Sequence, residues 1–163
     1  MRRLPLHPIL LGLVLAGCST DSATDPLSTS FAMVATPFSG RCALAIQPPT
    51  PISPGIVRQI DIGTCPFTHL GLSTYISDKV INFITGTQTL QNTYIAANGD
   101  RLYANGSGTN QLVAPGRVAF SADVTFAGGT GRFSNATGSA TVTGEADLVN
   151  ARSKFTTSGT IAY

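Results

Sequence analysis

The sequence contains no tryptophan, only two histidines and few charged residues. Asp, Glu, Lys and Arg make up 11% of its 163 residues, well below the roughly one quarter that is usual for soluble domains. So little charge argues against a coiled coil, a helical bundle and a charged disordered chain. The abundance of Gly, Thr, Ser and Ala instead favours a β-rich, turn-rich protein, and the length suits one domain.

An excess of charge of one sign is also missing. The ten Lys and Arg include Arg2 and Arg3, in an N-terminal segment that we expect to be removed, so that eight remain against eight Asp and Glu. Nucleic-acid binding draws on a strong positive patch. We therefore expect no nucleic-acid partner.

No apolar run is long enough to cross a membrane as a helix, which takes roughly 20 residues. The longest one, residues 4–16, follows the basic pair Arg2 and Arg3 and is followed by small residues. This order is that of a secretory signal peptide. We predict a cleaved leader over residues 1–17.

The leader ends on Leu15-Ala16-Gly17-Cys18, which resembles the lipobox of bacterial lipoproteins. The resemblance implies a diacylglycerol on the Cys18 thiol, cleavage just before Cys18 and attachment to the cell envelope. Ser19 implies the outer membrane, if the cell has one. Two or more acyl chains hold a protein stably on a bilayer. The alternative is an ordinary secretory leader that happens to end near a cysteine.

The chain after Cys18 divides into a tether and a domain. Residues 19–30 are polar, poor in core-forming side chains and interrupted by Pro26, so we expect residues 18–30 to be the lipidated cysteine and a flexible tether. Residues 31–163 are expected to fold as one domain.

Cys42 and Cys65 remain once Cys18 is lipidated, and an even pair in an exported protein indicates a disulfide, which we expect to tie an early strand to the start of the fourth strand region. The alternative is two free buried thiols. A metal site would need more thiols or histidines, and His69 is the one histidine after the leader. We therefore expect no metal.

The C-terminal half alternates apolar and polar residues with the period of a half-buried strand. Three such runs are clear, and their apolar or small positions are Val118, Phe120, Ala122, Val124 and Phe126; Ala140, Val142, Gly144, Ala146 and Leu148; and Phe155, Thr157, Gly159, Ile161 and Tyr163.

Upstream, residues 89–96 and 101–108 flank Asn98-Gly99-Asp100, a strong hairpin signal. Less regular strand runs are expected at about 40–46, 56–63, 67–76 and 79–85. Residues 47–55 carry four prolines, so this segment must be a surface excursion and not a central strand.

These elements predict an all-β fold, a single antiparallel β-barrel of about eight strands with no substantial helix after the signal peptide. A two-sheet sandwich is the alternative. The small Ala, Gly and Thr residues on the inward faces suit the interior of a barrel.

The segment Phe126-Ala127-Gly128-Gly129-Thr130-Gly131-Arg132-Phe133, followed by Ala136-Thr137-Gly138, resembles the Gly-Gly-Thr-Gly-(Lys/Arg)-Phe segment of the dirigent and allene oxide cyclase barrels. Residues 97–102 and 159–163 are also similar to that group. The resemblance covers about residues 65–163 and implies a barrel. No cavity residue of those families aligns with this chain, so no activity is carried over.

No group of side chains indicates catalysis. The segment 128–133 is expected to be a tight β connection and not a phosphate loop, because no helix follows it. Arg132 is expected to be exposed or packed beside Phe133, the alternative being an anion site. His69 has no Ser or Cys partner at a motif spacing, and the carboxylates of Asp100, Asp123, Glu145 and Asp147 are expected to be solubilising groups.

The function that best fits this pattern is a surface-tethered, non-catalytic module that binds a small apolar molecule or an envelope component, without a cofactor. A cyclase-like or isomerase-like enzyme working in an apolar barrel and a purely structural envelope protein are the alternatives. Asn92 and Tyr94, which share one strand face, are candidates to line a cavity. The contents of the barrel would separate the three: a solid interior favours the structural protein, an apolar cavity favours binding, and buried ionisable groups favour the enzyme.

Overall fold

The computed structural model describes residues 33–163, so the leader, Cys18 and the tether lie outside the described residues. The strands, in chain order, are β1 (Thr36–Ile46), β2 (Thr50–Ser53), β3 (Ile56–Phe67), β4 (Gly71–Asn82), β5 (Thr87–Ile95), β6 (Arg101–Ala114), β7 (Arg117–Gly129), β8 (Thr137–Asp147) and β9 (Arg152–Ala162). One turn of 3-10 helix, η1 (Gly131–Phe133), interrupts the path from β7 to β8.

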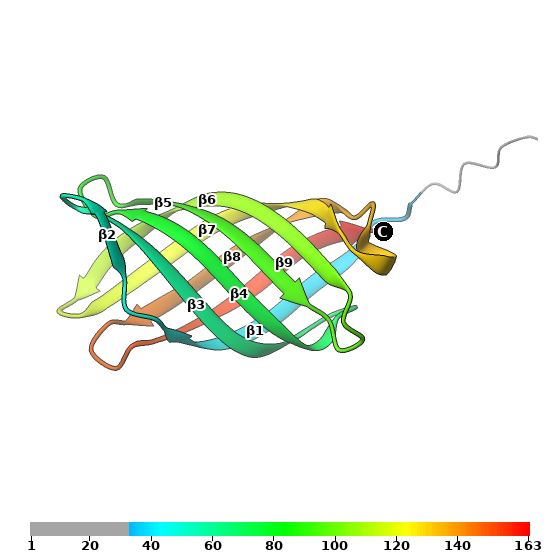
Figure 1. Cartoon of the computed structure of the whole chain (residues 1–163), viewed down its shortest axis with the longest axis horizontal. Helices are drawn as coiled ribbons and strands as arrows, with labels where there is room; N and C mark the ends of the chain where they lie inside the picture. The colour runs from blue at the N-terminus through cyan, green and yellow to red at the C-terminus, as the bar shows by residue number, and fades with distance from the viewer. Residues whose placement is uncertain (1–32) are drawn as a thin grey trace, which may run out of the picture. The chain divides into compact units, whose positions relative to one another are not determined.

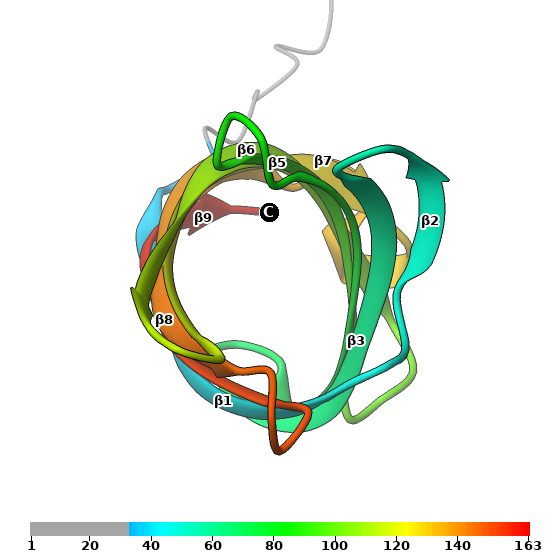
Figure 2. The same ribbon diagram turned by 90° about the vertical axis from the view of Figure 1, so that its left-hand side faces the viewer.

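Eight of these strands close into an antiparallel barrel (Figures 1 and 2). From β3 to β9 each strand pairs with the next in sequence, and β1 pairs with both β9 and β3. Closure leaves no open sheet edge around the ring. The predicted fold class is confirmed, and the sandwich is excluded.

The predicted alternation places side chains as expected. In β7 the side chains of Ala122, Val124 and Phe126 are buried, whereas Asp123 and Thr125 between them are exposed. The inward faces of β8 and β9 follow the same alternation. Their buried side chains include Ala140, Val142, Phe155, Thr157 and Ile161. The predicted hairpin is also present as β5 and β6, which pair from Ile95↔Arg101 onward.

Two expectations about the N-terminal half are wrong. The runs 67–76 and 79–85 are not two strands, because β4 continues without a break from Gly71 to Asn82. Cys65 accordingly lies near the end of β3 and not at the start of a fourth strand. Apolar and polar residues mix irregularly along β4, since its outward face carries Leu72 and Val80, and this hid its period.

The proline-rich segment is a surface excursion, as expected. Its residues 50–53 nevertheless form the short strand β2, which is exposed throughout and pairs with the start of β3 on the side that β1 leaves free. Figure 2 shows β2 outside the ring of strands. An edge position is the one place where a strand tolerates Pro51.

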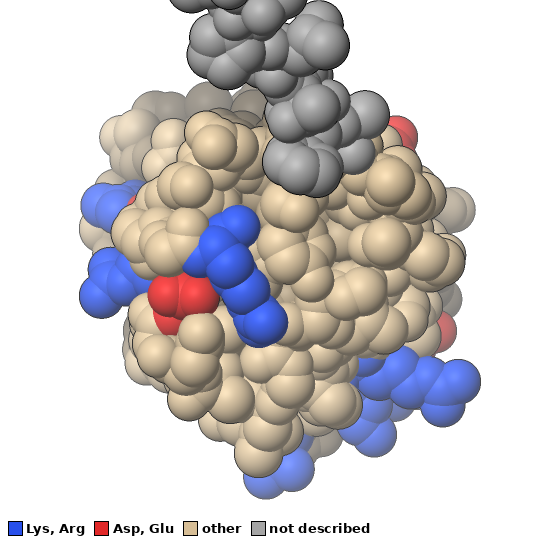
Figure 3. Space-filling model, turned by 90° about the vertical axis from the view of Figure 1, so that its right-hand side faces the viewer, with Lys and Arg blue, Asp and Glu red and all other residues tan. Residues whose placement is uncertain are grey.

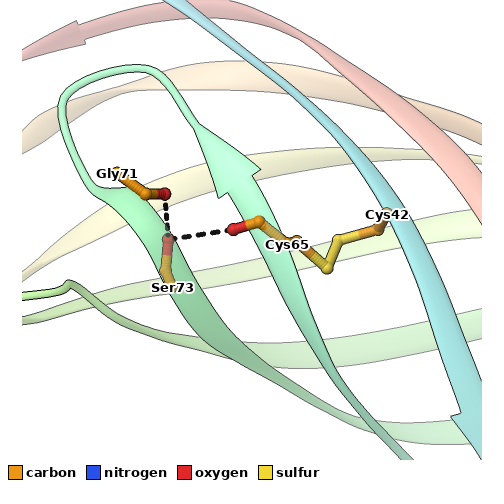
Figure 4. Close-up of a disulfide and its surroundings, with 4 residues drawn as sticks. All are labelled: Cys42, Cys65, Gly71 and Ser73. Carbon is orange, nitrogen blue, oxygen red and sulfur yellow. Dashed lines mark hydrogen bonds between the residues drawn. A yellow bond between two sulfur atoms is a disulfide. The ribbon is translucent and has the colours of Figure 1, made fainter.

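The predicted disulfide between Cys42 and Cys65 is present and joins β1 to β3 (Figure 4). The pairs Gly40↔Phe67 and Ala45↔Ile62 keep one register on either side of it, which places the two cysteines opposite each other with Cα atoms 4.9 Å apart. The Ser73 hydroxyl on β4 donates to the Cys65 carbonyl at 3.3 Å. The disulfide therefore staples the seam at which β1 meets β3.

Residues 33–163 include no helix that is long and apolar enough to span a membrane.

Candidate ligand site in the barrel lumen

The two ends of the barrel are built differently. We call the end with the β3–β4, β5–β6 and β7–β8 connections the closed end, and the end with the β4–β5, β6–β7 and β8–β9 turns the open end. β1 starts and β9 finishes at the closed end, where the C-terminus lies in Figure 1.

Aromatic rings fill the lumen toward the closed end. Phe38 stacks on Phe67, with ring centroids 5.6 Å apart, and meets Phe126 edge-on at 4.9 Å. Tyr94 packs edge-on against Phe67 at 5.0 Å, and Tyr75 lies 5.0 Å from Tyr94. These separations are those of favourable aromatic pairs, so this half of the lumen is a solid core.

Burial raises the pKa of both Tyr75 and Tyr94 above the usual value for tyrosine, because the phenolate would lose its hydration. Both tyrosines therefore stay neutral. Tyr94 belongs to the aromatic core and not to a cavity wall, in contrast to the expectation for it.

The glycine-rich connection caps the closed end. Phe133 on η1 is fully buried and lies 5.0 Å from the Tyr163 ring. Gly131 has a φ of 56°, and a Cβ there would overlap the Asp100 carboxylate, so glycine is required at this position. Figure 3 looks onto this end and shows a continuous, mostly uncharged surface where grey atoms do not cover it. The expected tight β connection is confirmed, with one 3-10 turn added.

Arg132 and His69 are part of this cap. The Arg132 guanidinium lies 4.8 Å from the Phe133 ring centroid and donates to the His69 carbonyl. The His69 Nε2 atom is 2.9 Å from the Pro37 carbonyl oxygen, and its ring packs edge-on against Tyr163. The structure thus gives both side chains packing contacts, and it does not bring them to a cavity.

The open end holds a cavity of about 320 Å³, at the lower end of the range for small-molecule sites. We call it the outer cavity. Its walls are mostly apolar and come from β4, β6, β7 and β8 together with the turn after β4. The apolar lining residues are Ile81, Phe83, Leu112, Val118, Phe120, Ala146 and Leu148.

At the floor of the outer cavity, Lys79 and Gln59 line the space and both bind Asp61, which does not itself line it, in a buried ion pair. Lys79 donates to the Asp61 carboxylate at 2.5 Å, and Gln59 donates to the other carboxylate oxygen at 2.9 Å. The Asp61 side chain is 1% exposed and that of Lys79 is 13% exposed. The Lys79 ammonium also lies 6.0 Å from the centroid of the Phe120 ring, within range of a cation–π contact.

A second, inner cavity of about 20 Å³ lies on the other side of Lys79 and Phe120, which line both spaces. This volume holds about one water molecule. Asn92 lines it as expected, and both polar atoms of its buried amide lack a protein partner, as does the Ser153 hydroxyl. The buried Nδ2 of Asn110 in the outer cavity is likewise unpaired. Polar groups without partners therefore continue along the lumen on both sides of the ion pair.

The rim of the open end is apolar. Exposed apolar side chains occupy its turns and the end of β6, and they are Phe83, Ile84, Leu112, Val113, Leu148 and Val149. A gathering of such residues around one opening is a feature of binding surfaces.

The carboxylates that the sequence singled out lie elsewhere. Asp100 accepts from Asn98 in the β5–β6 turn, and Asp123 accepts from Thr141 on the outer face of the barrel. Glu145 pairs in register with Lys154, and Asp147 accepts from Asn150 in the β8–β9 turn. This turn holds the pKa of Asp147 below its usual value. None of the four lines either lumen cavity.

The sequence patterns did not point to Asp61 and Lys79 as functional residues. A signal was available, because Gln59 and Asp61 alternate with Ile60 and Ile62 along β3. The rule that apolar side chains face the core would have placed the two isoleucines on the inward face of β3. Cys65 and Phe67 lie on the same face of β3 as Asp61. Because these two residues are buried, their face is the inward one and the isoleucines point outward.

Among residues 33–163 no group of three or more His, Cys, Asp or Glu is placed to hold a metal ion.

Comparison with protein-family models, with curated proteins and with solved structures gives no match. The resemblance to the dirigent and allene oxide cyclase barrels, over about residues 65–163, stays a prediction.

Proposed function

We propose that this protein is a lipid-anchored module of the bacterial envelope that binds a small, largely apolar molecule inside the open end of its barrel. The observation that carries the proposal is the outer cavity of about 320 Å³, walled by apolar side chains in a barrel whose other half is solid. A purely structural protein has no need for such a space, since filling it would add stability.

The proposed anchor is Cys18, with the outer membrane as its location if the cell has one. It rests on the order of charged start, apolar run and Leu15-Ala16-Gly17-Cys18. The test is incorporation of a labelled fatty acid in a bacterial host. Labelling and membrane fractionation should be lost in Cys18→Ser, and an unchanged Cys18→Ser protein would refute the anchor.

The binding site is tested on the full chain carrying Cys18→Ser, so that the protein can be purified without detergent. Native mass spectrometry should detect a copurifying small molecule. Ala146→Phe places a ring in the outer cavity and should abolish that adduct. Ala43→Phe makes the same change on an exposed position of β1 and should leave it. An adduct that survives Ala146→Phe would place the ligand elsewhere.

A second candidate, a cyclase-like or isomerase-like enzyme, is favoured by the Asp61–Lys79 pair at the cavity floor. A carboxylate and an ammonium in a site with little water can exchange a proton with a bound molecule. Recovery of the bound molecule in altered form, with no alteration in Lys79→Met, would favour the enzyme over the binding module.

A further inference from the structure

The lumen carries charges that cancel. Of the residues that line the two cavities in the described barrel, Asp61 and Lys79 are the charged ones, and they pair with each other. Both Asp61 oxygens are engaged, one by Lys79 and the other by Gln59. A ligand in the outer cavity therefore meets a neutral floor.

This floor still offers hydrogen-bond donors. An ammonium has three N–H groups, and Lys79 uses one on Asp61. The Nδ2 of Asn110, buried and without a partner, is a second donor lining the same cavity. Both groups suit an oxygen atom that accepts hydrogen bonds, whether it belongs to a hydroxyl, a carbonyl or a carboxylate.

The charge of the group that carries this oxygen decides which of the three groups, hydroxyl, carbonyl or carboxylate, binds best. A ligand carboxylate beside Lys79 would also lie beside the Asp61 carboxylate, so attraction to one is opposed by repulsion from the other. The cost of removing the carboxylate from water would then stay uncompensated. A hydroxyl or carbonyl can accept the same hydrogen bonds at a much smaller desolvation cost.

We propose that the lumen selects amphiphiles with an uncharged polar head. The head oxygen accepts from Lys79 and Asn110, and the tail runs between Ile81, Leu112 and Leu148 toward the apolar rim. This inference rests on the proposed function and narrows it to a class of ligand.

The test compares two ligands that differ in head charge alone, 1-decanol and decanoate, by isothermal titration calorimetry at neutral pH with the full-length Cys18→Ser protein. We expect decanol to bind at least about tenfold more tightly. This comparison needs no lumen variant. Equal affinities, or tighter binding of decanoate, would overturn the inference while leaving the proposed function in place.

Asp61→Asn removes the charge that excludes anions, and it should reverse the preference in favour of decanoate. Asp78→Asn is the matched control, because it removes a carboxylate from an ion pair on the outer face of the barrel; its preference should equal that of the parent protein. If the Asp61→Asn protein binds decanol and decanoate with the same ratio of affinities as the parent protein, the role given to the ion pair is overturned.

Asn110→Leu keeps the size of the side chain, removes an unpaired buried amide and should fold in any case. We expect it to weaken decanol binding about fivefold, and unchanged binding would overturn the role of Asn110 as a donor.

Failure of both amphiphiles to bind the parent protein, or decanol binding that survives Ala146→Phe, would refute both this inference and the proposed function. Circular dichroism of each variant confirms that the barrel is intact.

Discussion

The closed and open halves of the barrel use the same strands in opposite ways. Toward the closed end, the inward positions carry large rings, such as Phe38 and Phe126, that touch one another and leave no space. Toward the open end, polar groups and apolar side chains that do not fill the interior line a cavity of about 320 Å³.

Under the proposed function, this difference separates stability from binding within one fold. A barrel of eight strands encloses just enough room for its own side chains or one small ligand. Here one half holds the side chains and the other leaves room. We expect the closed half to stabilise the fold and the open half to give up stability for a site.

The largest effect should come from truncation in the closed half. Phe38→Ala removes a side chain that is 1% exposed and contacts several rings, which should lower the free energy of unfolding by about 3–5 kcal/mol. Phe120→Ala should cost less, because this ring already borders both cavities. Urea denaturation measures both variants, and a larger loss for Phe120→Ala would break the comparison.

Next comes the staple at the β1–β3 seam. Cys42→Ala together with Cys65→Ala opens a loop of 23 residues, which should cost about 3 kcal/mol in the chain-entropy description. Chemical denaturation of the double variant, compared with the parent under oxidising conditions, measures this cost. Reducing agent should destabilise the parent and leave the double variant unchanged.

A smaller loss is expected from the ion pair in the open half. Lys79→Met leaves the Asp61 carboxylate buried without its cation, which should cost about 2–3 kcal/mol, at the low end for buried pairs because Lys79 keeps some access to water. Combining Lys79→Met with Asp61→Asn should recover much of that loss. If the double variant is less stable than Lys79→Met alone, the ion pair stabilises the fold. That result would contradict the assignment of stability to the closed half of the barrel.

The smallest effect belongs to the outer surface. The hydrogen bond from Arg58 holds the pKa of Asp78 below its usual value. The ionised carboxylate therefore adds stability above its unfolded-state pKa, and this is lost as the pH falls through the lower folded-state pKa. Thermal melts should show a slight deficit for Asp78→Asn at pH 7 that disappears at about pH 2. A deficit as large as that of Lys79→Met would contradict the difference between the two pairs.

How far the sequence predicts this molecule depends on the side chains involved. Period-two alternation with Ala122, Val124 and Phe126 predicts which face of β7 is inward, because in a barrel with a packed interior the inward face of a strand is apolar. The same rule fails at Asp61 and Lys79, where the inward face is charged and its outward neighbours include Ile62 and Val80. The pairing of β3 with β4 brings these two side chains together, and the alternation of Gln59 and Asp61 with isoleucines is the one sign of it in the sequence.

The β1–β9 pairing bears on how the chain reaches its native state. Ten residue pairs join β1 to β9, from Thr36↔Ile161 to Ala45↔Arg152, so the first strand of the ring cannot find this neighbour until the last has been synthesised. Contacts between such distant residues form slowly. Until then β1 and the newest strand are exposed sheet edges that can pair with another chain. The Cys42–Cys65 bond spans only 23 residues and can form early, which shortens the search by fixing β1 beside β3 before β9 arrives.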